Sequence, residues 1–156
     1  MRISLLLLLA LAALLISCGS EPKPAPEPAK PAVVKPADET RRFPSANLVN
    51  TEVVNTQLLG KSFMPGGTLA HYKHGKHEYT MFIVKMPTAQ DAAFLLLDWN
   101  KTLKGSQIVP AFGGYCGDDA GRPVFVFAKD RWVAGVAGLP QKEADLAARS
   151  LAAHLD

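Results

Sequence analysis

The apolar positions of this chain change their spacing along its length, and the changes divide it into three parts. An almost unbroken apolar run fills residues 3–16, whereas residues 21–38 carry few large apolar side chains. Beyond that point apolar residues either alternate with polar ones, as in half-buried strands, or recur every three to four positions, as in helices. The pattern predicts an N-terminal segment 1–17, a spacer 18–40 and one folded domain 41–156.

Within the domain the predicted elements follow one another as strand, strand, helix, strand, strand, strand, helix. This order is typical of an α+β fold, in which two helices pack on an antiparallel sheet of about five strands. Within residues 42–67, the stretch 51–59 fits a short strand or a short helix equally well, and residues 111–121 are expected to form a glycine-rich loop. The predicted elements are a hairpin over 68–86, a helix over 88–104, a strand at 107–109, a hairpin over 124–137 and a helix over 140–155.

The two hairpins are predicted from turn residues between apolar runs. We expect His74-Gly75 to form the first turn, because Gly adopts positive φ freely and His tolerates it. Lys129-Asp130 is the expected second turn. In that second hairpin Phe125, Phe127, Trp132 and Ala134 would share one face, and Val124, Val126 and Val133 the other. Apolar residues on both faces indicate a covered, central position in the sheet.

The predicted helices have recognisable ends. Thr88 is placed to cap the first helix, with Asp91 three residues later in a capping-box position, and Gly105 is the expected stop. Pro140 suits the first turn of the second helix.

The N-terminal apolar run follows Arg2 and ends at Leu15-Ile16-Ser17-Cys18. It is shorter than the about 20 apolar residues that a membrane-spanning helix needs, and it has the charge, apolar core and small-residue end of a secretory signal. This segment resembles the signal peptide of bacterial lipoproteins. The resemblance implies cleavage before Cys18 and attachment of lipid to its thiol and new amino group. Gly19, in place of an Asp, would then favour the outer membrane.

The spacer is rich in Pro, Ala, Lys and Glu, with prolines at 22, 24, 26, 28, 31 and 36. Because Pro fixes φ and lacks an N–H, neither helix nor sheet is expected here. We expect a disordered, extended tether that reaches on the order of 60 Å from the bilayer. The implied location is the cell envelope, at the outer membrane or periplasmic face rather than the cytoplasm.

Charge argues against one class of partner. Residues 41–156 carry thirteen Lys and Arg against ten Asp and Glu, a net charge of +3. The basic residues are scattered, and Arg41-Arg42 is their only adjacent pair, so no nucleic acid is expected to bind.

The clearest candidate for a metal site is the histidine tract His71, His74 and His77. Three imidazoles can hold Zn or Cu, but strand alternation in the predicted hairpin puts His71 and His77 on opposite faces. We therefore predict no metal and no other cofactor.

A second candidate is the predicted loop. Cys116 lacks a CxxC partner, a His tied to it by any motif and, with Cys18 lipidated, a disulfide partner. The loop matches no phosphate-binding pattern, and Asp118-Asp119 lack EF-hand spacing. Loops often carry binding residues, so we expect ligand contact at Tyr115, Asp118, Asp119 and Arg122.

Tyr79 to Leu97 and Phe112-Gly113-Gly114-Tyr115 through Pro123 to Trp132 resemble an uncharacterised family of bacterial exported domains. The resemblance covers about residues 60–155 and implies no activity. We expect a lipid-anchored envelope protein without enzymatic activity that binds an envelope protein or ligand. The alternative is an envelope enzyme acting through Cys116 or the carboxylates of Asp118 and Asp119.

Overall fold

The computed structural model describes residues 35–110 and 112–156, which belong to the compact unit Val33–Asp156. The predicted signal peptide, the lipid attachment at Cys18 and residues 18–34 of the predicted tether lie outside these residues. Within the described part, no helix is both long and apolar enough to cross a bilayer.

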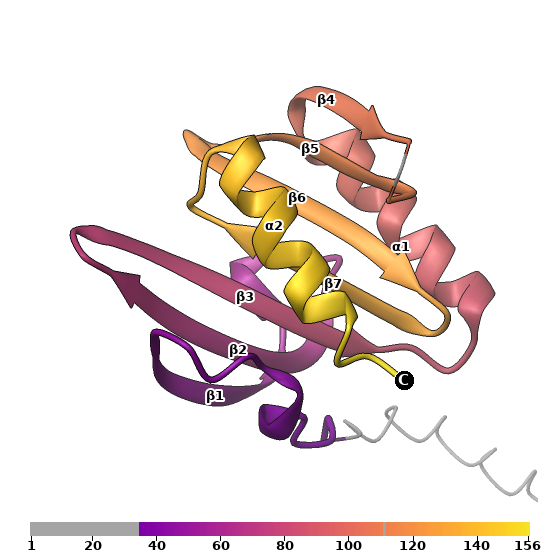
Figure 1. Ribbon diagram of the computed structural model, residues 1–156. Helices are drawn as coiled ribbons and strands as arrows, with labels where there is room; N and C mark the ends of the chain where they lie inside the picture. Colours follow the sequence, from indigo (N-terminus) through magenta and orange to yellow (C-terminus); the bar gives the residue numbers. More distant parts are fainter. Residues whose placement is uncertain (1–34, 111) are drawn as a thin grey trace, which may run out of the picture. The chain divides into compact units, whose positions relative to one another are not determined.

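One antiparallel sheet of seven strands organises the domain, in the order β1-β2-β3-β7-β6-β5-β4 (Figure 1). The later strands β7, β6, β5 and β4 follow in reverse sequence order beside β3, so β3 and β7 join the first three strands to the last four. The strands are β1 (Leu48–Thr56), β2 (Pro65–His74), β3 (His77–Lys85), β4 (Lys104–Val109), β5 (Gly114–Asp119), β6 (Arg122–Lys129) and β7 (Trp132–Ala137).

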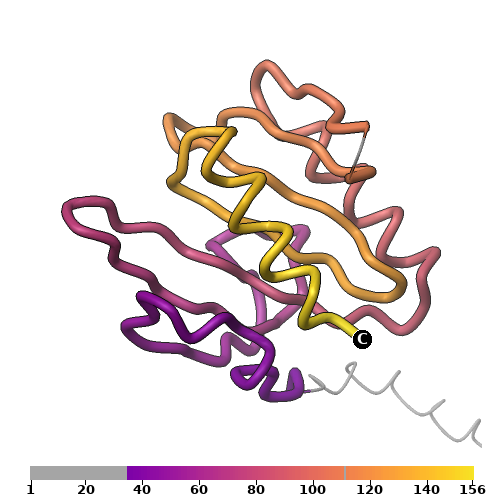
Figure 2. The backbone as a smooth tube through the Cα atoms, in the orientation of Figure 1, coloured from indigo at the N-terminus to yellow at the C-terminus, as the bar shows by residue number. Residues whose placement is uncertain are grey.

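The two helices cover opposite faces of this sheet. Helix α1 (Ala89–Thr102) packs on β5, β6 and β7, and α2 (Gln141–Ala152) packs on β6 and β7 from the other side. Figure 1 draws α2 in front of the sheet and α1 behind it. The backbone tube in Figure 2 shows the same arrangement in the same orientation. Two short 3₁₀ helices, η1 (Thr40–Arg42) and η2 (Leu58–Gly60), flank β1.

Each face of the sheet has its own apolar core. The α1 side contains Phe82, Val126, Val133 and Trp99, and the α2 side contains Ile83, Phe125, Phe127 and Trp132. The face assignment predicted for the β6–β7 hairpin is therefore confirmed. Both strands lie in the middle of the sheet, buried on both sides, as their apolar composition indicates.

The predicted N-terminal ends of the helices are confirmed, but the predicted stop of the first helix at Gly105 is wrong. The Thr88 side chain accepts a hydrogen bond from the Asp91 backbone N–H at 3.1 Å and donates one to the Asp91 carboxylate at 2.7 Å. Pro140 is the residue immediately before α2. The first helix ends at Thr102, and Gly105 lies within β4 at a φ of 63°.

The α+β class, the antiparallel sheet and the two helices are as predicted, but the count of about five strands is wrong. Residues 48–56 form β1, and residues 114–119 form β5 rather than part of a loop. The glycines of β5 misled the prediction. A Cβ on Gly114 would lie 2.4 Å from the Val126 carbonyl oxygen, so this Gly allows close strand contact and does not mark a chain reversal.

Both hairpin turns lie one residue later than predicted. His74 pairs with His77 around Gly75-Lys76, and Lys129 pairs with Trp132 around Asp130-Arg131. Moving a turn by one residue shifts each strand partner by two. Because side chains alternate with a period of two, the residues keep their faces.

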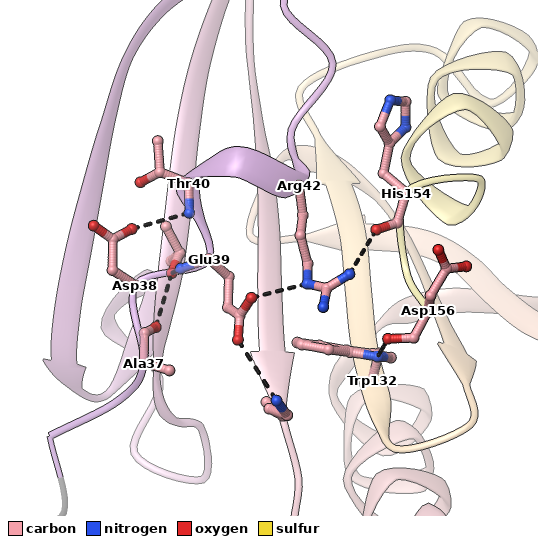
Figure 3. A network of polar contacts seen from close by, with 10 residues as sticks. Ala37, Asp38, Glu39, Thr40, Arg42, Trp132, His154 and Asp156 are labelled. Atoms are coloured by element: carbon pink, nitrogen blue, oxygen red, sulfur yellow. Dashed lines mark hydrogen bonds and ion pairs between the residues drawn. The ribbon is translucent and has the colours of Figure 1, made fainter.

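The N-terminal end of the described chain is tied to its C-terminal end. The buried Glu39 carboxylate accepts a hydrogen bond from the Arg42 guanidinium at 2.8 Å and lies 3.8 Å from the Lys85 ammonium (Figure 3). Arg42 also donates to the His154 carbonyl oxygen at 2.9 Å and lies over the Trp132 ring. The packed domain thus includes Glu39, which precedes the boundary at residue 41 expected from composition.

We expect Glu39→Ala to lower the free energy of unfolding by about 1–3 kcal/mol, because it leaves two cations beside Trp132 without their carboxylate. Urea denaturation of the full chain measures the change. Glu78→Ala is the control, since it removes one partner of an exposed ion pair with Lys73 and should leave the midpoint unchanged. Equal effects of the two substitutions would contradict this role of Glu39.

Candidate functional site

The four residues predicted to contact a ligand lie on the β5–β6 hairpin, and the sheet separates Asp118 from the other three. Tyr115 packs against the α1-side core, whereas the neighbouring Cys116 belongs to the α2-side core. Asp118 lies on the Cys116 side of β5 and Asp119 on the Tyr115 side, because side chains alternate along a strand. The four residues therefore do not form one cluster.

Three of these residues have contacts within the domain. The Asp118 carboxylate accepts from the Gly121 backbone N–H at 2.7 Å and thereby holds the β5–β6 turn. Asp119 pairs with the Lys61 ammonium at 2.7 Å. Arg122 donates to the Thr80 hydroxyl at 2.7 Å and to the Ala137 carbonyl oxygen at 3.1 Å. These contacts give all three side chains a structural role.

A groove lies on the α2 face, where the helix leaves β4 and β5 uncovered. Two adjoining recesses of about 270 and 730 Å³ form it, and both are lined by Phe125 and Gln141. We call it the α2 groove. Its lining includes Gln107 and Val109 of β4, Cys116 and Asp118 of β5, Phe125 of β6, and Gln141, Ala144 and Leu146 of α2.

The elements around the groove explain its position. Helix α2 packs on β6 and β7. Its buried stripe, which consists of Ala144, Ala148 and Leu151, faces these strands. Beyond its edge the sheet continues with β5 and β4, whose residues Gln107, Cys116 and Asp118 line the groove on that face. The Phe112 ring packs edge-on against Phe125 and Phe127, with centroids 5.5 and 4.6 Å apart.

Cys116 belongs to the lining of this groove and is only 7% exposed. Burial raises the pKa of its thiol, and a hydrogen bond to backbone opposes that shift only in part. No His lines either recess. A neutral, buried thiol without a base is a weak nucleophile, so Cys116 contributes apolar surface.

Metal chemistry also lacks a ligand set in the described part of the chain, where no three His, Cys, Asp or Glu side chains come together. His71 lies beside Glu52, with 3.2 Å between imidazole Nε2 and carboxylate Oε1. His74 and His77 face each other at the exposed tip of the hairpin. The α2 groove instead offers an apolar floor with the amides of Gln107 and Gln141 at its rim. Such a surface can bind a ligand.

Sequence reasoning found two groove residues, Cys116 and Asp118, but not the groove. Gln107 and Gln141 carry no motif, and they lie more than thirty positions apart in the chain. One signal was available: Leu146 is an apolar residue outside the buried stripe of α2, and it is 68% exposed.

Comparison of the chain with protein-family models, with curated proteins and with solved structures gives no match. The resemblance to an exported-domain family therefore stays a prediction.

We expect iodoacetamide to alkylate Cys116 more than about tenfold more slowly in the native protein than in urea. In the native protein only a small fraction of the Cys116 thiol is ionised, and its burial limits access of the reagent. Since the pKa is raised, the native rate should still be rising at pH 9. Mass spectrometry of the Cys116 peptide measures both effects. Fast native labelling that levels off near neutral pH would indicate a reactive thiol and favour the enzymatic alternative.

Proposed function

We propose that this protein is a lipid-anchored module of the bacterial cell envelope that binds a partner or ligand and carries out no chemistry of its own. The observation that carries the proposal is the α2 groove, a largely apolar recess between α2 and strands β4 and β5, lined in part by the Cys116 thiol, whose pKa is raised. Pockets of this kind are the usual binding sites of small domains.

The sequence pattern before residue 35 supports the envelope location. A charged start, a short apolar run and Ser17-Cys18 resemble a lipoprotein signal peptide. A diacylated Cys would hold the protein firmly at a membrane, since each buried methylene contributes about 0.8 kcal/mol. A domain anchored in this way needs no membrane-binding surface of its own.

Groove chemistry supports binding over catalysis. Asp118 accepts a backbone hydrogen bond, and Asp119 forms an ion pair with Lys61 on the other face. A carboxylate pair for acid and base catalysis needs two groups that face one reacting atom. The lining of the α2 groove combines apolar side chains and two amides with charged groups, which are the carboxylates of Asp118, Glu143 and Asp145 and the ammonium groups of Lys104 and Lys142. A partner with an apolar segment and a few hydrogen-bonding groups fits this lining.

We expect Cys18→Ser to abolish lipid attachment, because the resemblance makes this thiol the acceptor. Intact-mass analysis of the protein from its native envelope should show a processed, acylated chain for the parent. The variant should lack the added lipid mass and leave the membrane fraction. Acylation of the variant, or an unmodified parent, would exclude the proposed anchor while leaving the binding role of the groove open.

We expect a photo-crosslinking amino acid at Leu146 to capture a discrete partner or ligand in intact cells, because this position lies on the groove rim. Position 49 is the matched control, since Val49 is 64% exposed on the far edge strand β1. Gln107→Trp in the Leu146 background should fill the groove and reduce the adduct several-fold. The binding proposal fails if both positions give the same adducts or if Gln107→Trp has no effect.

A further inference from the structure

A polar recess lies on the α1 face of the sheet, near the turn between β2 and β3 and on the opposite side from the α2 groove. Thr80 lies two residues before Phe82, and Arg122 two residues before Val124, so both share the face of the α1-side core. The recess has a volume of about 610 Å³, and no residue of either helix belongs to its lining. We call it the Arg122 recess. Its polar lining consists of Asn50, His71, Lys73, Glu78, Thr80 and Arg122.

A buried hydroxyl lies in the middle of the Arg122 recess. Thr80 is only 5% exposed, and its hydroxyl oxygen accepts a hydrogen bond from Arg122 Nη2 at 2.7 Å. Among the described residues no group accepts the proton of this hydroxyl. A hydroxyl can donate one hydrogen bond while it accepts others. Thr80 therefore has a donor left for a ligand.

The Arg122 guanidinium is held in place by two uncharged groups. Its Nη2 donates to the Thr80 hydroxyl and, at 3.1 Å, to the Ala137 carbonyl oxygen. Its register partner on β5, Asp119, pairs instead with the Lys61 ammonium at 2.7 Å. Within the described chain Arg122 forms no ion pair, and its Nε and Nη1 atoms donate to no acceptor. A guanidinium fixed in this way presents its remaining N–H groups as a rigid fork, which suits the oxygens of a phosphate or carboxylate.

Further hydrogen-bonding side chains lie on the other side of Thr80. In the strand register Thr80 pairs with His71 on β2, and His71 pairs with Asn50 on β1. Arg122 reaches Thr80 from the opposite direction, since β7 and then β6 follow β3 in the sheet. Directly opposed residues have Cβ atoms about 4.5–5.5 Å apart. A ligand above Thr80 therefore meets Arg122 on one side and His71 and Asn50 on the other.

The charges around the recess favour an anion. Lys73 and Glu78 form an ion pair of 2.8 Å, so their charges largely cancel, and His71 Nε2 lies 3.2 Å from Glu52 Oε1. The guanidinium of Arg122 adds a positive charge to the lining without an ion-pair partner in the described chain. Donors on two sides suit a phosphate, whose oxygens accept hydrogen bonds in several directions. A planar carboxylate needs only one guanidinium.

We propose that the Arg122 recess binds a soluble phosphate compound, held by Arg122, the Thr80 hydroxyl and the side chains of His71 and Asn50. A membrane surface fits less well, because anionic lipids attract clusters of about four to eight basic residues. Lys73 is the only other Lys or Arg in the lining. The recess has the size of a small-molecule site, so it also accommodates the group that carries the phosphate. This site is separate from the α2 groove, and the failure of either proposal leaves the other intact.

A phosphate titration of the full chain tests the site. Inorganic phosphate is added to the purified protein in detergent micelles, and the backbone amide signals of His71 and Thr80 are followed by NMR. Chloride holds the ionic strength constant, so that general screening does not change. We expect saturable shifts at both positions. Arg122→Gln should weaken the apparent affinity at least tenfold, because hydrogen bonds from a charged donor are about twice as strong as neutral ones.

Three further variants separate the site from general charge effects and from the fold. Lys76→Gln removes an exposed cation at the tip of the same hairpin, outside the lining, and should leave the affinity unchanged. Asn50→Ala removes an exposed donor of the recess and should weaken binding several-fold without changing the thermal unfolding midpoint. Glu78→Gln removes the carboxylate from the lining and should strengthen binding.

Several outcomes would overturn the proposal. It is wrong if the shifts do not saturate, if Arg122→Gln and Lys76→Gln have equal effects, if Asn50→Ala leaves the affinity unchanged, or if Glu78→Gln weakens binding. Acetate that binds as tightly as phosphate would exclude the phosphate preference. Vesicles that contain phosphatidic acid are the last probe. If they bind in an Arg122-dependent way while inorganic phosphate gives no shifts, the phosphate belongs to a lipid and the soluble ligand is excluded.

Discussion

The domain depends on one constraint: the β6–β7 hairpin is buried between two helices and has to be apolar on both faces. Phe125 and Phe127 face α2, while Val126 and Val133 face α1. Gly135 keeps the layers close, since a Cβ at that position would lie 2.5 Å from the Phe82 ring and 2.6 Å from the Phe125 carbonyl oxygen. Because protein interiors are closely packed, the tight contacts of this hairpin fix the distance at which each helix and each neighbouring strand can lie.

The two helices leave different surfaces open. Because α2 crosses only β6 and β7, the α2 face of β4 and β5 remains uncovered and forms the α2 groove. Helix α1 covers β5 to β7 and leaves Phe94 and Leu97 exposed on its outer side.

The elements with strong local signals could be predicted. Thr88 with Asp91, Pro140 and the alternating apolar residues of the second hairpin each identified an element and its buried face. The strands β1 and β5 lacked such signals. The polar residues of β1 suit an edge strand, and the glycines of β5 are explained by close contact with its neighbours. Such contacts are not visible in a local pattern.

The sequence by itself determined the α+β class, the N-terminal ends of both helices, the faces of the β6–β7 hairpin and the separation of His71 from His77. These follow from short-range chemistry, because caps, turns and strand alternation act over a few residues. Only the tertiary structure decided that Tyr115, Asp118, Asp119 and Arg122 have separate contacts, that Cys116 lines a groove with Gln141, and that Glu39 joins the two ends of the domain. Each of these depends on strand order and helix placement, which bring together residues far apart in the chain.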